Sequence, residues 1–347
     1  MNEQAILLGV PKVEYGGEGI TPFPMCLKAC ANYLGMDVSY NYVMAACGAA
    51  FRLTWDTTRW NFGNVDVIFT FDDPSKVYRT GIESLGCEYN LIGRTPKTEK
   101  AEFTSFIKAR IDAGYPCIAL GIIGPPEACV ITGYRDGGDT LLGWNFFQDN
   151  PEFASAMSFD ESGYFISDQW WENPETKAVM SLGEVTKERF TPKTILENAI
   201  EVLSGRQWHG TAKGRSAYDA WAKTILNDDD FPENAILSIL AERLMVHGDA
   251  MDTLADGRYA AAEYMKSLIS LYPTHQKKLE EAAACFMQVH QTFGRMNEIL
   301  GGVYRGENEM RMFAKPSVRK QISGIIYEAK SADEKALGII KELVSIL

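Results

Sequence analysis

The spacing of apolar residues divides the chain into two regions of different periodicity. Before about residue 190, short helical patterns alternate with short runs of β-branched and aromatic residues. From Thr191 onward, apolar residues recur about every 3.6 positions, as they do in amphipathic helices. The sequence therefore predicts an α+β domain over 1–190 and an all-α domain over 191–347, with a hinge or interface near 168–192.

The stretch from Thr21 to Gly35 predicts a short helix with a cysteine near its start. A Pro-rich entry precedes the helix, and Gly35 ends it in the left-handed conformation that glycine adopts most easily. Cys26 is then expected in the first turn, where unpaired N–H groups and the helix dipole stabilise a thiolate. Cys26 is a candidate nucleophile. The alternative is that Cys26 and Cys30, one turn apart, both pack in a core.

The rest of the first region predicts further helices and an antiparallel sheet. Helical patterns span 38–50, 75–85 and 100–113, and the last two end at glycines. The expected strands are 117–123, 129–134, 140–144, 163–166 and 178–182. The sequence Arg-Asp-Gly-Gly-Asp between the second and third strands is a strong signal for a hairpin. Helices followed by antiparallel strands define an α+β class.

Aromatic residues are dense in the segments 51–55 and 60–62, which include Trp55 and Trp60. Arg52 lies among them. This composition is typical of the wall of a pocket, and equally of a packed core in which the aromatic rings are buried. The sequence alone leaves both interpretations open.

The second region predicts a bundle of six or seven helices. The helical patterns span 192–203, 216–226, 231–247, 257–271, 275–300 and two helices between 316 and 347. No heptad register or 34-residue repeat is sustained, so a bundle is favoured over a coiled coil or a solenoid. The run from Trp208 to Trp221 combines a Gly-rich loop with aromatic and ionisable residues. His209 lies on this loop and is a candidate base, although a single histidine is more often structural.

Composition limits the possible partners. The formal net charge of −12 and the lack of a basic run make nucleic acid an improbable partner. No stretch has the length and apolar character of a membrane span, and the first residues do not resemble a secretion signal. Seven cysteines without a CxxC pair favour reduced thiols over a disulfide framework. We expect a cytoplasmic protein.

The order of these features resembles a known family. A cysteine at the head of an N-terminal helix, a strand ending in Val-Ile-Thr-Gly-Tyr134, a tight turn and a strand with a polar residue are similar to papain-like peptidases that trim bacteriocin leaders. The pattern more closely resembles the butirosin biosynthesis protein H family, in which this fold precedes a helical region. The resemblance covers about the first 190 residues. It implies that Cys26 matches the nucleophile, Glu127 the position of the histidine, and Asn145 the orienting residue.

The chain departs from the peptidase pattern at two points. The six residues before Cys26 contain no glutamine to hold an oxyanion, and all four histidines lie after residue 190. A carboxylate at Glu127 can act as a base only if burial raises its pKa, and we expect Pro125 and Pro126 to help exclude water. An ionised Glu127 would instead oppose the thiolate.

Two hypotheses follow. The first is a catalytically degenerate papain-like protein that binds a small molecule or peptide in a cleft near Cys26, lined by both domains. The second is a cysteine acyltransferase or amide-bond enzyme in which Glu127 or His209 accepts the proton; the resemblance implies an acyl-thioester donor. The sequence lacks metal-ligand spacings, nucleotide-binding glycine motifs and a serine-hydrolase motif, so we predict no metal and no cofactor.

Overall fold

The computed structural model describes residues 3–62, 66–124, 127–155, 157–232 and 234–347. The chain forms two compact units, each described here by itself. The first unit comprises residues 1–43 and 78–189, and the second comprises 44–77 and 190–347. Residues 44–77, which the predicted boundary assigns to the first domain, thus belong to the second unit.

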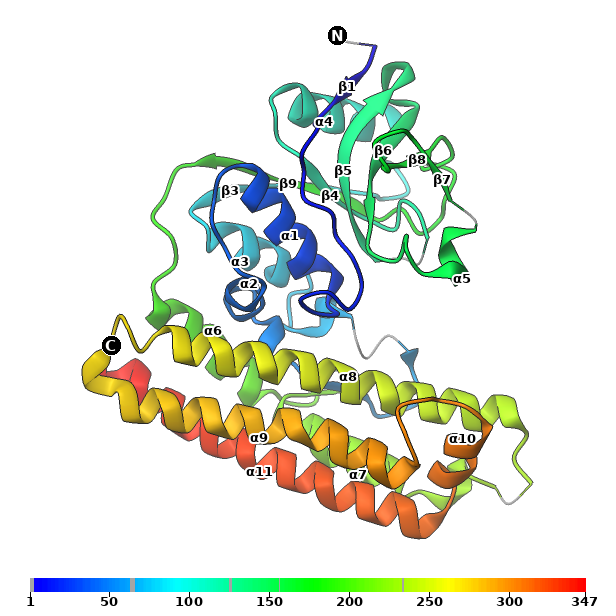
Figure 1. Ribbon diagram of the computed structural model, residues 1–347, viewed down its shortest axis with the longest axis vertical. Helices are drawn as coiled ribbons and strands as arrows, with labels where there is room; N and C mark the ends of the chain where they lie inside the picture. Colours follow the sequence, from blue (N-terminus) through cyan, green and yellow to red (C-terminus); the bar gives the residue numbers. More distant parts are fainter. Residues whose placement is uncertain (1–2, 63–65, 125–126, 156, 233) are drawn as a thin grey trace. The chain divides into compact units, whose positions relative to one another are not determined.

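The first unit is built on an antiparallel sheet (Figure 1). The order of its strands is β3-β9-β4-β5-β6-β8-β7. Strand β1 pairs with the end of β5 that extends past β4. The strands are β1 (Ala5–Ile6), β3 (Cys87–Gly93), β4 (Cys117–Leu120), β5 (Ala128–Arg135), β6 (Thr140–Asn145), β7 (Ser158–Phe159), β8 (Phe165–Ser167) and β9 (Ala178–Val185). The five strands expected from the sequence all form, with small shifts at their ends. The short strands β1 and β7 were not predicted from the sequence, and strand β3 was not predicted either.

The hairpin between β5 and β6 forms where it was predicted. Asp136, Gly137 and Gly138 adopt φ angles of 53°, 67° and 106°, so three successive residues have the left-handed conformation that reverses the chain. Only glycine adopts this conformation without strain, which is why the Gly-Gly pair is a reliable turn signal.

Helices are also present in this unit. They are α1 (Pro22–Tyr33), α2 (Tyr40–Ala46), α3 (Lys76–Glu83), α4 (Lys100–Asp112) and the short α5 (Pro151–Ala154); α2 and α3 cross from one unit to the other. Both α1 and α4 contact β4 and β5. Phe103, Ile107 and Ile111 lie at four-residue intervals on α4 and are buried in the core of this unit.

The second unit contains the C-terminal helical region. Its helices are α6 (Pro192–Ser204), α7 (Arg215–Ile225), α8 (Leu237–Ser267), α9 (Gln276–Leu300), α10 (Glu307–Phe313) and α11 (Pro316–Ile346). In Figure 1 the long helices α8, α9 and α11 lie side by side, and α7 packs against α11. A two-stranded antiparallel sheet, β2 (Thr54–Asp56) with β10 (Thr211–Lys213), completes the unit.

Two boundaries in this region were predicted incorrectly. The segments 231–247 and 257–271 belong largely to one continuous helix, α8, and the two helices expected after Pro316 are the single helix α11. Glycines inside α8 serve close packing instead of ending the helix. A Cβ atom on Gly257 would lie 2.8 Å from the carbonyl oxygen of Ala50, and one on Gly248 would collide with the Arg305 guanidinium.

A buried ionic network fixes residues 44–77 to the helices. Arg258 on α8 is fully buried and pairs with Asp333 on α11 at 2.6 Å. Its guanidinium also donates to the carbonyl oxygens of Ala50 and Arg52, at 2.7 and 3.2 Å. The hydroxyl of Tyr218 donates to Asp333 at 2.7 Å. Because these groups satisfy one another, an early segment of the chain is held in the core of the second unit.

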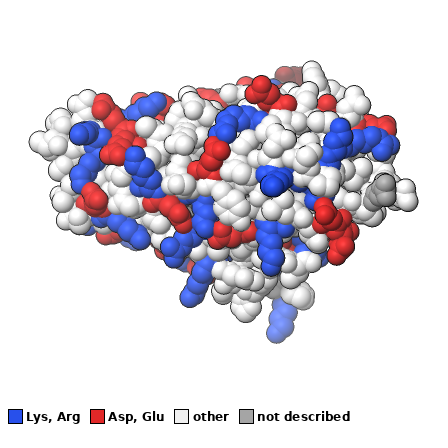
Figure 2. All heavy atoms as spheres, turned by 90° about the horizontal axis from the view of Figure 1, so that it is seen from below, with Lys and Arg blue, Asp and Glu red and all other residues white. Residues whose placement is uncertain are grey.

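On the face shown in Figure 2, basic and acidic side chains are interspersed. Such a mixed surface lacks the single-sign field that steers polyanions. Within the described parts of the chain, no helix combines the length and apolar character needed to cross a membrane.

Candidate functional site

Cys26 lies inside the core of the first unit and is fully buried. It is the fifth residue of α1, which begins at Pro22, so it falls in the second helical turn. The unpaired N–H groups of a helix belong to its first four residues. The sequence-based placement of Cys26 in the first turn was therefore wrong by about one residue, and the expected stabilisation of a thiolate weakens accordingly. The helix ends as predicted, with Gly35 at φ 79°.

The electrostatic surroundings of Cys26 oppose a thiolate. Burial raises the pKa of its thiol well above the ordinary value, and neighbouring Cys129, Cys30 and Glu127 raise it further. Burial also raises the pKa of Cys129 to about 12. The pKa of the Cys26 thiol is shifted in the direction opposite to the one expected from the sequence, because desolvation outweighs the helix dipole. A neutral, buried thiol is a poor nucleophile.

Glu127 lies immediately before β5 and is half-buried. Its carbonyl oxygen accepts a hydrogen bond of 3.2 Å from the N–H of Gly121. Its carboxylate helps to raise the pKa of the Cys26 thiol. The charge acts against the nucleophile. The role of Glu127 at the position of the peptidase histidine stays a prediction. Pro125 and Pro126, which were expected to shield Glu127, lie outside the described residues.

Asn145 ends β6 opposite Cys129 and is buried. Its amide nitrogen donates to the carbonyl oxygen of Ile123 at 2.8 Å, and its amide oxygen accepts from the N–H of Phe147 at 2.8 Å. The side chain is thus used to hold the backbone that follows β4 and β6. These contacts are those of a structural residue, and the orienting role of Asn145 stays a prediction.

His209 belongs to the second unit and is exposed. Together with Gly210 it forms a two-residue turn, in which Trp208 and Thr211 exchange backbone hydrogen bonds of 2.7 and 2.9 Å. The φ angles of His209 and Gly210, 47° and 83°, suit a type I′ turn. The structure thus gives His209 a turn position. Cys26, Glu127 and Asn145 share the first unit, and the role of His209 as their base remains a prediction, as does a pocket shared by both domains.

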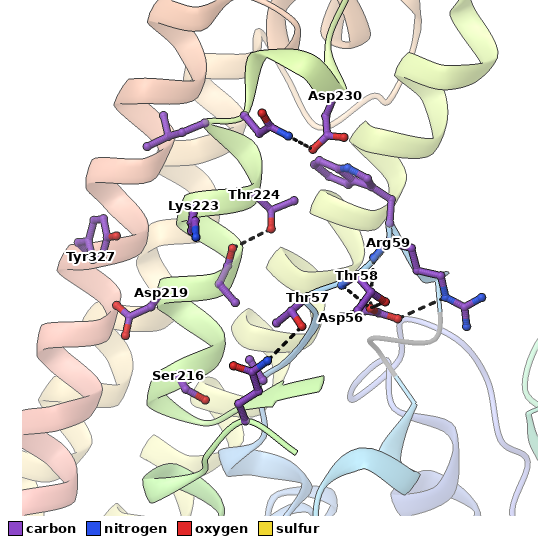
Figure 3. A pocket seen from close by; sticks show the side chains of 16 residues that line it. Asp56, Thr57, Thr58, Arg59, Ser216, Asp219, Lys223, Thr224, Asp230 and Tyr327 are labelled. Atoms are coloured by element: carbon purple, nitrogen blue, oxygen red, sulfur yellow. Dashed lines mark hydrogen bonds and ion pairs between the residues drawn. The ribbon is translucent and has the colours of Figure 1, made fainter. Parts of the chain in front are cut away.

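A cavity of about 1310 Å³ lies within the second unit (Figure 3). It is bounded by the segment after β2, by α7 and the residues that follow it, and by Tyr327 on α11. The lining residues are Asp56, Thr57, Thr58, Arg59, Trp60, Gln207, Ala212, Ser216, Asp219, Ala220, Lys223, Thr224, Leu226, Asn227, Asp230 and Tyr327. This volume is large enough for a small organic molecule or a short peptide.

Asp56 organises one wall of the cavity. Its carboxylate accepts hydrogen bonds from the backbone N–H and hydroxyl of Thr58, at 2.8 and 2.6 Å, and from the amide of Asn61 at 3.1 Å. Arg59 adds a contact of 3.4 Å. Partial burial would raise the pKa of Asp56, but the hydrogen bonds together outweigh it and lower the pKa. Asp56 therefore stays ionised as an anchor for the loop.

The turn at His209 supports the same wall. Both the backbone N–H and the hydroxyl of Thr57 donate to the carbonyl oxygen of Gly210, each at 2.8 Å. The amide of Gln207 reaches the hydroxyl of Thr57 at 3.4 Å. The loop that follows β2 and lines the cavity is thus held both by Asp56 and by the turn at His209.

Helix α7 supplies the opposite wall through one face. Ser216, Asp219, Ala220 and Lys223 recur at intervals of three and four residues, so their side chains point the same way. Figure 3 shows Asp219 and Lys223 on this helix, with Tyr327 beyond them on α11. Trp55 and Trp221 are fully buried behind these walls. Trp55 packs against Trp60 and Trp221 with ring centroids 5.6 and 5.9 Å apart.

Sequence reasoning missed most of this site. The aromatic segment was interpreted as pocket wall or core, and it is both: Trp55 is fully buried, whereas Trp60 lines the cavity. The polar spacing of 216, 219 and 223 was visible in the sequence, but many exposed helix faces have such a pattern. Among the described side chains, no group of three or more His, Cys, Asp or Glu is arranged to hold a metal ion.

No protein-family model matches the chain, and none of the curated proteins matches it significantly.

Proposed function

We propose that the protein binds a small polar molecule or a short peptide in the cavity of the second unit. The observation that carries the proposal is a cavity of about 1310 Å³ whose wall at Asp56 is already fixed by hydrogen bonds. A preformed wall lowers the entropy that a ligand must lose on binding. The exposed ring of Tyr327 and the exposed side chain of Leu226 add apolar surface to a polar lining.

We propose further that the first unit is a catalytically inactive papain-like module of a cytoplasmic protein. A helix carrying Cys26 that packs on an antiparallel sheet supports the likeness to the butirosin H family. The full burial of Cys26 and its raised pKa favour binding over acyl transfer. Seven free cysteines are in keeping with a reducing compartment.

A screen for binders tests the proposal. We would measure binding of organic acids, amines, sugars and N-acetyl dipeptides by ligand-observed NMR and by thermal shift. Ala220→Phe fills the cavity from α7, and binders of the wild-type protein should lose affinity for it. Arg215→Phe places the same ring on α7 but outside the lining of the cavity. This variant should bind the same ligands with unchanged affinity.

A second pair of variants guards against a folding defect in Ala220→Phe. Tyr327→Ala removes half-exposed ring surface from the cavity, whereas Tyr304→Ala removes an exposed ring elsewhere in the unit. Binding that weakens in Tyr327→Ala and not in Tyr304→Ala supports the cavity. A ligand that binds all four variants with the same affinity would have its site elsewhere on the protein.

A further inference from the structure

The carboxylates that line the cavity are already engaged. Asp56 accepts hydrogen bonds from Thr58, and Asp230 accepts one of 3.1 Å from the amide of Asn227. Asp219 accepts two hydrogen bonds, of 2.7 and 2.9 Å, from the ammonium of Lys330 on α11. A ligand that needed a free carboxylate would have to displace one of these contacts.

Lys223 is the opposite case. It lies four residues after Asp219 on α7, which is the spacing at which an acidic and a basic side chain commonly pair on a helix. Asp219 is occupied by Lys330 instead, and Lys223 has no ion pair or side-chain hydrogen bond with any residue that the structure describes. Its ammonium therefore keeps three donors for a ligand.

Two further donors border the same cavity. The side chain of Arg59 is 74% exposed, and its single contact to Asp56 is 3.4 Å long, so most of its N–H groups remain available. The hydroxyl of Tyr327 makes no hydrogen bond within the described chain, and the residue is 47% exposed. The cavity thus offers the ammonium of Lys223, most of the N–H groups of Arg59 and a hydroxyl, while each of its lining carboxylates accepts hydrogen bonds within the described chain.

We propose that the cavity selects ligands with an anionic group, a carboxylate or a phosphate, which Lys223 binds directly. The inference rests on the proposed function and adds the class of ligand. Charge-assisted hydrogen bonds from Lys223 hold the anion, and the ring of Tyr327 with Leu226 takes an apolar part. Lys330 acts as a positioning residue, because it holds Asp219 away from Lys223.

A set of matched aromatic probes tests the charge preference. Benzoate and phenyl phosphate are anions, benzylamine is a cation, and benzyl alcohol is neutral, and all four have a similar size. NMR titrations at low salt should show tighter binding of the two anions to the wild-type protein. Lys223→Met should weaken the anions about fivefold and leave benzyl alcohol unchanged, whereas the control Arg215→Met should change neither. Comparing benzoate with phenyl phosphate tells which anion is preferred.

The role of Lys330 gives a second, sharper readout. Lys330→Met should free Asp219 to pair with Lys223 and so weaken benzoate, although Lys330 does not line the cavity. In a Lys223→Met background, Lys330→Met should have no further effect on the anion. Equal effects of Lys330→Met in both backgrounds would show that it acts through the general field of the protein and would overturn this role.

Different results would contradict the inference of an anionic ligand and the proposed binding function. If benzylamine binds as tightly as benzoate, or if Lys223→Met leaves both anions unchanged while Ala220→Phe abolishes binding, the cavity is a binding site but the anion inference is wrong. If no ligand of the screen or of the probe set is lost in Ala220→Phe, the proposed function itself is wrong.

Discussion

Asp219 on α7 pairs with Lys330 on α11, at 2.7 Å, and not with Lys223 on its own helix. The packing of α7 against α11 brings the two partners together. A pair between helices thereby replaces the local i, i+4 pair that the sequence would favour. Lys223 is left without an ion pair in the part of the chain that the structure describes, which is the basis of the ligand class inferred above.

The first prediction separates charge from stability at this pair. The side chain of Asp219 is 53% exposed and that of Lys330 is 22% exposed, and ion pairs that remain open to solvent contribute little. We expect Lys330→Met to lower the free energy of unfolding by no more than about 1 kcal/mol in urea titrations. Lys266, which is 50% exposed and pairs with Glu263 on its own helix, gives a more exposed comparison in Lys266→Met. A loss of several kcal/mol would mean that Lys330 is needed for the fold.

The second prediction concerns the buried pair of Arg258 and Asp333. Removing one partner leaves an uncompensated charge in the core, so Arg258→Met should lower the free energy of unfolding by about 3–5 kcal/mol. The double variant Arg258→Met with Asp333→Leu removes both charges and should recover much of that loss. Chemical denaturation of the three proteins measures both effects. A double variant as unstable as the single one would indicate that Arg258 acts mainly through its hydrogen bonds to the backbone.

The third prediction concerns Cys26. Because burial raises the pKa of its thiol, iodoacetamide at neutral pH should modify Cys26 in the folded protein no faster than the other cysteines. All seven should react rapidly in urea. Mass spectrometry after timed labelling locates each adduct. Selective and rapid labelling of Cys26 would instead favour the acyltransferase hypothesis.

The fourth prediction concerns pH. Burial lowers the pKa of His247 to about 3, and its ring accepts a hydrogen bond of 3.1 Å from Trp221. Below about pH 6.5 the unfolded chain binds a proton there that the folded chain does not, so stability falls as pH falls toward 3. Asp249 works in the other direction, because burial raises its pKa to about 6.

His247→Phe isolates the contribution of the histidine. The substitution keeps a ring beside Phe313, on which the imidazole stacks at 4.5 Å, but it cannot titrate. Between pH 6 and 4.5 the free energy of unfolding of the wild type should fall more steeply than that of the variant, by about 1.0 to 1.4 kcal/mol per pH unit. Asp249 is common to both proteins and cancels. Parallel curves would show that His247 is protonated in the folded state.

Local signals in the sequence predicted much of the first unit. The hairpin at 136–138 and the end of α1 at Gly35 depend on backbone conformations that glycine alone adopts readily, so they could be found without tertiary information. The continuity of α8 could not be predicted in this way. Gly248 follows the first of the two predicted helices and Gly257 begins the second, but within α8 their role is to admit Arg305 and Ala50, which are distant in sequence.

The candidate site was harder to predict for the same reason. The environment of Cys26 depends on Cys129 and Glu127, which come from another part of the chain, and desolvation decides its pKa. The cavity is built from the segment after β2, from α7 and from α11. That Lys223 has no ion pair among the described residues follows only from the pairing of Lys330 with Asp219. No local pattern contains this information.

The most direct test of the account is to observe where a ligand binds. Trp60 lines the cavity, and its indole N–H has no hydrogen-bond partner among the described residues. Trp170 lies in the core of the first unit. With ¹⁵N-labelled tryptophan, and with Trp60→Phe to assign the signal, we would titrate the tightest of the four aromatic probes. The account predicts a saturable shift of the Trp60 indole resonance and none at Trp170. A shift at Trp170 with Trp60 unchanged would contradict it.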